Sequence, residues 1–135
     1  MKVAFIEDSV EMGGVQFSTY FLAEHLMNEK SADVRIFLPG EGPFSILCQE
    51  NTIPYRIYNT IPYISTSISL LNDELRIPNP LVWVYNICAI LLNCKRIKIK
   101  LNQYVPHLAV TKGLLNHFSA GLACKNLNLP VIWHV

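Results

Sequence analysis

The sequence has few charged residues and almost no excess of either sign. Charged side chains make up 16% of the 135 residues, and 11 Lys and Arg are balanced by 10 Asp and Glu, for a formal net charge of +1. A protein that binds nucleic acid usually carries a strong positive field, so we expect no nucleic-acid partner. Hydrophobic residues account for 51% of the chain, and the mean hydropathy is +0.28. This composition argues against disorder and predicts a folded core.

The cysteines and histidines lack the spacings of a metal site. The four cysteines contain no CxxC pair and the four histidines no HExxH motif, so we expect no metal and reduced, intracellular thiols. The opening residues, MKVAFIEDSV, place acidic side chains where a secretory signal peptide has its apolar segment. We therefore expect the protein in the cytoplasm.

Short apolar runs alternate with segments of helical periodicity. Strands are predicted at 3–6, 34–38, 55–58, 108–111 and 131–135, and helices at 17–29, from 43 onward, at 81–92 and at 115–127. Residues 60–79, rich in Ser, Thr and Pro, are predicted to form a long irregular connection. Continuously apolar strands that alternate with helices indicate a parallel sheet covered on both faces. We predict one α/β domain, 1–135, with a Rossmann-like doubly wound sheet.

Two glycines, Gly13 and Gly14, lie where the first strand gives way to the first helix. In doubly wound sheets ligands bind beyond the carboxyl ends of the strands, where the strand order reverses, and both this loop and the Thr111-Lys112-Gly113 loop lie there. Unpaired N–H groups at a helix start attract anions. The glycines therefore have two interpretations: a turn that needs positive φ, or a close approach by the phosphates of a ligand.

The glycine loop does not match the common phosphate-binding signatures. GxGxxG is incomplete, and the Walker sequence GxxxxGK[ST] is absent. A phospho-receiver domain would use Glu7 and Asp8 as metal ligands, but it would also need an aspartate after the third strand, where this chain has Asn59.

Two segments carry a family resemblance, KVAFIEDSVEMGGVQFSTYFLAEHL near the start and HLAVTKGLLNHFSAGLACKNLNLPVIWHV at the end. Together they resemble the N-terminal, acceptor-side domain of GT-B glycosyltransferases of the family 4 type. The matching ends cover about half of the chain. The resemblance implies a retaining transferase that moves a sugar from a nucleotide-sugar donor to a sugar or lipid-linked acceptor, with no metal cofactor.

The resemblance also assigns roles to single residues, none of them catalytic. It implies that Gly13 and Gly14 approach the donor diphosphate, and that Gln16 orients their loop or is a solvated first-turn residue. Lys112 stands where relatives often have His, Asn or Gly, and either meets a phosphate or an acidic acceptor or is a solvated loop lysine. His134 lies two residues before the position of a histidine that is common in the family, and it is either a ligand contact or a buried strand residue.

The donor-binding C-terminal domain of the family has no counterpart in residues 1–135. We therefore expect an N-terminal fragment that is inactive alone. Two alternatives remain open: a non-enzymatic Rossmann-like module that binds a phosphorylated small molecule, and an interaction domain that pairs with a separate catalytic chain.

Residues 81–100 combine an apolar run with a basic end, Lys95-Arg96-Ile97-Lys98-Ile99-Lys100. The apolar run is shorter than the roughly 20 residues that span a bilayer. Such a segment either lies in the interface of an anionic membrane, here the inner face, or is a core helix with a solvated charged tail. The lipid-linked acceptors that the resemblance implies favour the first interpretation.

Overall fold

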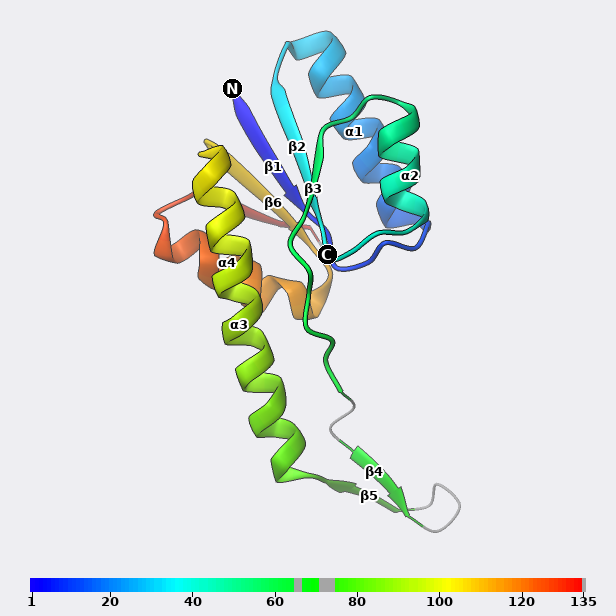
Figure 1. The fold of residues 1–135 in the computed structure, drawn as a ribbon, viewed down its shortest axis with the longest axis vertical. Coiled ribbons are helices and arrows are strands. Elements are labelled where there is room, and N and C mark those ends of the chain that lie inside the picture. Colours follow the sequence, from blue (N-terminus) through cyan, green and yellow to red (C-terminus); the bar gives the residue numbers. More distant parts are fainter. Residues whose placement is uncertain (65–66, 71–74, 135) are drawn as a thin grey trace.

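The computed structural model describes residues 1–64, 67–70 and 75–134 (Figure 1). Along the chain the elements are β1 (Lys2–Ile6), α1 (Gly14–Lys30), β2 (Asp33–Leu38), α2 (Pro43–Glu50), β3 (Tyr55–Ile57), β4 (Ser67–Leu70), β5 (Leu75–Pro78), α3 (Pro80–Tyr104), β6 (Leu108–Lys112), α4 (Leu114–Asn126) and β7 (Val131–His134).

Five strands form one parallel sheet in the order β3-β2-β1-β6-β7. The central strand is β1, in which Ala4 is in register with Arg35 of β2 on one side and with Ala109 of β6 on the other. The chain first adds strands on the β2 side and then crosses back to β6, so the strand order reverses between β1 and β6. The predicted Rossmann-like doubly wound α/β fold is confirmed.

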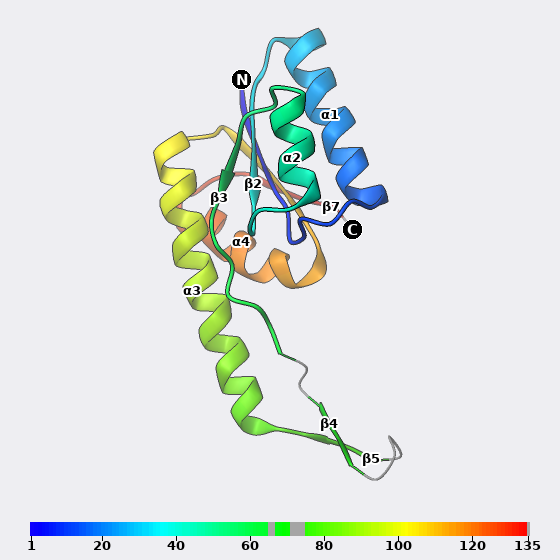
Figure 2. The same ribbon diagram turned by 45° about the vertical axis from the view of Figure 1, so that its right-hand side comes forward.

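Alternate side chains of the central strands belong to two separate cores, one on each face of the sheet. Val3 and Phe5 pack in the core that also contains Ala23 of α1 and Phe44 of α2. Ala4, Ile6 and Ala109 pack on the other face with buried residues of α3 and α4, among them Ile97, Leu101, Ala120 and Ala123. Figure 2 shows α1 and α2 on one side of the sheet and α3 and α4 on the other.

Helix α1 lies where the sequence predicts it but presents a different face to the sheet. Its buried residues are Gln16, Thr19 and Ala23. Phe17 and Phe21 are exposed, and their rings stack at a centroid distance of 6.5 Å. From the sequence alone, the helical spacing of Phe17 and Phe21 predicts that they lie on the apolar face of the helix, and the structure shows that this prediction is wrong. The polar residues turn inward because β1 ends in a buried carboxylate that needs hydrogen-bond donors.

Helix α3 extends past the predicted apolar run and continues through the basic segment to Tyr104. Its second half packs on the sheet through Cys94, Ile97, Leu101 and Tyr104, whereas its first half projects beyond the sheet together with β4 and β5 (Figure 1). Asn79 caps its start by accepting a hydrogen bond from Leu81 N at 3.0 Å. In the part of the chain that the structure describes, no helix has the length and hydropathy needed to cross a bilayer.

The connection over 60–79 is not irregular throughout. Its described residues include β4 and β5, which pair antiparallel, so that part of the prediction is wrong. Residues 65–66 and 71–74 of the same prediction lie outside the described residues, as does residue 135 of the last predicted strand. At the other end of the chain Asn128, just after α4, has φ +52°, the left-handed conformation that asparagine often adopts at the end of a helix.

Candidate functional site

The carboxyl edge of the sheet carries two adjoining pockets beside the point where the strand order reverses. One, of about 290 Å³, is lined by Asp8, Ser9, Val10, Pro39, Gly40 and Thr60. The other, of about 240 Å³, is lined by Asp8, Tyr58, Thr60, Ile61, Pro62, Tyr63 and Asn116. Asp8 and Thr60 belong to both. The candidate site is therefore built from the residues that follow β1, β2 and β3 and from the first turn of α4.

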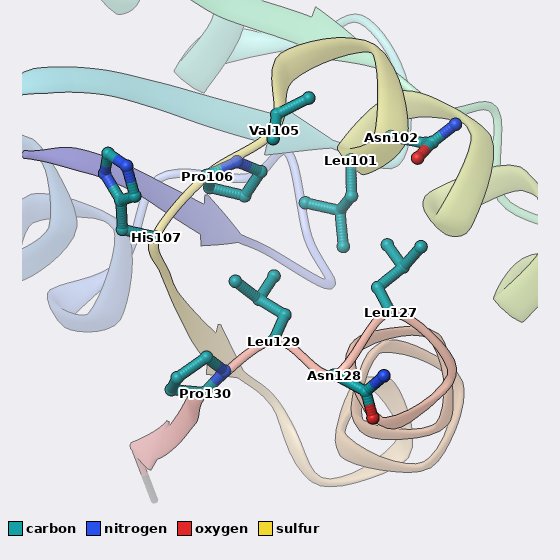
Figure 3. A pocket seen from close by; sticks show the side chains of 9 residues that line it. All are labelled: Leu101, Asn102, Val105, Pro106, His107, Leu127, Asn128, Leu129 and Pro130. Atoms are coloured by element: carbon teal, nitrogen blue, oxygen red, sulfur yellow. The ribbon is translucent and has the colours of Figure 1, made fainter.

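A further pocket, of about 260 Å³, lies at the opposite end of the sheet (Figure 3). It is formed by the segments that lead into β6 and β7 and by the last turn of α3, and its lining includes Leu101, Leu127 and Leu129. Ligands of doubly wound sheets bind at the carboxyl edge, so this pocket does not belong to the candidate site.

A buried carboxylate, Glu7, stands at the end of β1. It accepts hydrogen bonds from Thr19 Oγ1 at 2.5 Å and from Gln16 Nε2 at 3.3 Å, both on the first turns of α1. Its own backbone is also paired, since its N–H donates to the Phe37 carbonyl and its carbonyl accepts from the Tyr58 hydroxyl at 2.8 Å. Glu7 thus ties the start of α1 to β1, β2 and the end of β3.

Lys112, at the end of β6, is the buried positive charge beside Glu7. Its Nζ donates to the Val15 carbonyl at 3.4 Å, so it also lies under the first turn of α1. Burial raises the pKa of the Glu7 carboxyl to about 7, although the Thr19 hydrogen bond and the charge of Lys112 oppose the shift. Burial lowers the pKa of the Lys112 ammonium, and the charge of Glu7 opposes that shift.

The two glycines begin α1 directly above this pair. Gly13 is the N-cap residue with φ −149° and ψ −178°, an extended conformation open to any residue, and among the described residues Gly113 is the one glycine whose φ lies in the range that disfavours side chains. A turn that needs positive φ therefore does not explain Gly13 and Gly14, and that interpretation is wrong. A Cβ on Gly14 would meet nothing within 4 Å, so the start of the helix is open to an approaching ligand.

The other predicted site residues differ from their simplest interpretations. Gln16 is buried and bonded to Glu7, so it is not a solvated residue. Lys112 is buried at the end of a strand, so it is not a solvated loop lysine. His134 lies in a strand as expected, but it is exposed, which corrects the expectation of a buried residue. The fold brings Gly13, Gly14, Gln16 and Lys112 together and makes His134 the β7 register partner of Lys112.

The carboxyl edge also contains residues that are not among the predicted site residues. Gly113 has φ +85°, and a Cβ there would lie 1.6 Å from Asp8 Oδ2, so the Asp8 carboxylate occupies the place of a side chain at the start of α4. Burial raises the pKa of Asp8, and a hydrogen bond from its own backbone N–H opposes the shift. The only available signal was the acidic pair Glu7-Asp8 directly after an apolar strand.

His117, on the first turn of α4, is also buried at this edge. Its Nδ1 lies 2.7 Å from Thr111 Oγ1, its ring stacks on Trp133, and its Nε2 has no hydrogen-bond partner among the described atoms. Among the described residues, no group of three or more His, Cys, Asp or Glu is arranged to hold a metal ion.

Solved structures of glycosyltransferases share this fold at low sequence identity. MurG of Acinetobacter baumannii is 18% identical with a TM-score of 0.65 over 98% of this chain, and a glycosyltransferase of Rickettsia africae ESF-5 is 20% identical with a TM-score of 0.62 over 98%. Anabaena Alr3699/HepE, solved in complex with UDP and glucose, is 16% identical with a TM-score of 0.63 over 100%. The likeness covers only 34%, 28% and 29% of those chains, respectively, so this chain spans about a third of the length of these glycosyltransferases.

The same fold also occurs in a protein of another activity. A deacetylase from the biosynthesis of teicoplanin, solved in a complex with teicoplanin, is 13% identical with a TM-score of 0.64, over 97% of this chain and 68% of its own. No protein-family model matches the sequence, and neither does any curated protein. The comparisons therefore establish the fold, and the function has to be argued from the site.

Proposed function

We propose that the chain is the N-terminal, acceptor-side half of a retaining GT-B glycosyltransferase of the family 4 type, which uses a nucleotide-sugar donor. The observation that carries this proposal is the start of α1, where Gly13 and Gly14 are free of any positive-φ requirement and Gly14 faces open space. The fold likeness to glycosyltransferases, one of them bound to UDP and glucose, supports it.

In this proposal the start of α1 holds a diphosphate without a metal ion. The first N–H groups of α1 have no partner within the helix, and they lie at the positive end of its dipole. Gly14 lets phosphate oxygens reach these groups, and Lys112 adds positive charge beneath the same turn. Glu7 opposes the anion when it is ionised, so we expect diphosphate to bind more tightly below pH 7. In this proposal His134 contacts the acceptor or a phosphate from β7.

A second domain completes the proposed enzyme. It would bind the nucleotide and the donor sugar across a cleft from the carboxyl edge, and it would be supplied by the same polypeptide or by a separate one. Residues 1–135 alone are then inactive, and sugar transfer by the purified 135-residue chain would overturn this part of the proposal. The alternative is a module that binds a phosphorylated small molecule at the same glycines and needs no second domain.

Titration calorimetry with UDP distinguishes these functions. The glycosyltransferase half should bind UDP measurably only when a donor-domain polypeptide is present, whereas the binding module should bind it alone and saturably. In either case Gly14→Ala should weaken binding about tenfold or more, because the added methyl group blocks the approach to the helix start. The melting temperature should not fall, since the new Cβ meets no neighbour.

Asn28→Ala is the control for this experiment. Asn28 is exposed near the end of α1 that is far from Gly14. We expect it to lower neither stability nor UDP binding. If UDP binds neither to the isolated chain nor to the mixture, or if Gly14→Ala binds like the parent, the glycine loop is not a diphosphate site.

A further inference from the structure

The first half of α3 forms an exposed apolar arm that extends beyond the body of the domain (Figures 1 and 2). We use the name arm for residues 80–92 together with the extended segment 61–64 beside them. Leu81 is 77% exposed, and the other large apolar residues of α3 that are exposed here are Trp83, Val84, Tyr85, Ile87, Leu91 and Leu92. An apolar surface of this extent is unusual on a protein that works alone in water.

The exposed residues of the arm continue into a basic segment on the same side of the helix. Leu81, Val84, Cys88 and Leu91 recur every three or four residues, and Lys95 and Lys98 continue this spacing. All six are exposed. The opposite side of α3 carries the buried residues, including Asn93, Ile97 and Tyr104.

The extended segment is fixed to α3 by two asparagine side chains. Asn93 accepts from Ile61 N at 2.7 Å and donates to Ile61 O at 3.0 Å. Asn86, two turns earlier, accepts from Ile64 N at 2.9 Å and donates to Ile64 O at 2.8 Å. These bonds satisfy backbone groups of the segment on the helix side. The arm therefore presents its apolar side chains without having to unfold.

The charges of α3 determine what kind of partner can cover the arm. The helix contains Lys95, Arg96, Lys98 and Lys100 and no Asp or Glu. A second copy of the chain would bring these charges together with no acidic residue on either helix to pair with them. A partner with an apolar interior and a negatively charged surface would match both the exposed apolar residues of the arm and the basic residues that follow them. An anionic bilayer has this arrangement.

We propose that the arm docks on an anionic lipid bilayer. Leu81, Val84 and Leu91 enter the boundary of the acyl chains, while Lys95 and Lys98 contact the headgroups. This interaction goes beyond the proposed function and does not depend on it, because no residue of the glycine loop takes part.

Sedimentation with lipid vesicles tests the proposal on the purified chain. We expect the chain to bind vesicles of phosphatidylcholine with 30% phosphatidylglycerol and to bind pure phosphatidylcholine at least about tenfold more weakly. Lys95→Glu/Lys98→Glu should weaken binding to the anionic vesicles about 30-fold or more, since each basic residue near the surface contributes about a factor of five to ten. Val84→Gln/Leu91→Gln should weaken binding to both kinds of vesicle.

Matched controls separate the arm from general charge and hydropathy. Lys30→Glu/Lys125→Glu makes the same change in net charge at two exposed lysines outside α3, and Ile46→Gln exchanges an exposed apolar residue of α2. We expect all three exchanges to leave vesicle binding within about twofold of the parent. Equal loss in the lysine controls would overturn the proposal, because it would indicate nonspecific attraction.

Two further results would also overturn it. One is the absence of binding to anionic vesicles. The other is a dimer in sedimentation velocity that Val84→Gln/Leu91→Gln dissociates, since the occupant of the arm would then be a second copy.

Discussion

At the scale of single residues, the carboxyl edge is organised by two buried side chains of opposite charge. Glu7 and Lys112 end neighbouring strands, and both contact the first turns of α1. A buried charge costs folding free energy unless hydrogen bonds and a counter-charge offset its desolvation. Two apolar side chains at these positions would avoid this cost. Glu7 and Lys112 are therefore better explained by a role in holding the glycine loop and setting the local electrostatic potential than by a role in stability.

The raised pKa of Glu7 predicts that the stability of the chain depends on pH. The folded-state value of about 7 lies above the ordinary value of 4.5, so the folded state holds this proton more tightly. The stabilising contribution is fully present below pH 4.5 and is lost as the pH rises through about 7. It amounts to at most about 3 kcal/mol. Glu7→Gln should remove it, so urea unfolding at several pH values should show a flatter profile for the variant.

An exposed carboxylate provides the control for this measurement. Glu11 is near Glu7 in the sequence but exposed, so Glu11→Gln should keep the pH profile of the parent. A parent profile that is already flat between pH 4.5 and 8, or that rises over this range, would show that Glu7 is not protonated by burial.

Gly113 is the glycine whose backbone does require the absence of a side chain. Its φ of +85° is strained for other residues, and an added Cβ would collide with Asp8. We expect Gly113→Ala to lower the free energy of unfolding by about 2 kcal/mol or more. Asp8→Ala in the same chain should recover the part due to the collision and leave the backbone strain. No loss in urea unfolding of Gly113→Ala would contradict this account.

At the scale of elements, the sequence predicts the positions of helices and strands better than their orientation. The parallel sheet, its five strands and the helix after Gly13-Gly14 follow from apolar runs and periodicity. The face of α1 that packs on the sheet cannot be predicted in this way. The spacing of Phe17 and Phe21 favours an aromatic inner face, whereas Gln16 and Thr19 are buried because they donate hydrogen bonds to the buried Glu7. The proximity of Glu7 to Lys112 is not predicted either, because it depends on strand order, which a local sequence pattern does not contain.

The arm was predicted only in part, for a related reason. Residues 81–92 form a helix, as predicted, but an apolar run of this kind is also compatible with a helix buried in the core. In the structure the basic half of α3 covers the sheet and much of the apolar half is exposed. Lys95 and Lys98 extend away from the sheet, while Ile97 and Leu101 on the opposite side are buried. Only one side of the helix packs on the sheet, and the mean hydropathy of the segment does not show which side that is.

The asparagine contacts of the arm predict unequal effects of two similar substitutions. Asn93 is buried, so Asn93→Ala leaves the N–H and carbonyl of Ile61 without these partners, and we expect a loss of about 2–3 kcal/mol in the free energy of unfolding. Asn86→Ala should cost less than about 1 kcal/mol, since its hydrogen bonds are exposed and water replaces them. Urea unfolding measures both, with the exposed Asn102→Ala as the neutral control.

At the scale of the whole molecule, one sheet connects two cores that share no side chains. Cys48 belongs to the core beneath α1 and α2, and Cys94 and Cys124 belong to the core beneath α3 and α4. Each central strand contributes alternate residues to both cores, so neither core can be lost while the sheet remains intact. We therefore expect the domain to unfold as one cooperative unit.

The reactivity of the four cysteines measures this cooperativity without an introduced label. All four are free thiols, of which Cys88 is exposed and the other three are buried. Burial raises the pKa of Cys48 to about 11 and that of Cys124 to about 12, which suppresses the reactive thiolate. A disulfide reagent at pH 8 should therefore modify one thiol per native chain rapidly, and none in Cys88→Ser. With increasing urea the three buried thiols should become reactive in a single transition. If Cys94 and Cys124 reacted at lower urea than Cys48, the two faces of the sheet would be separate folding units, and α3 with its arm would open independently of the glycine loop.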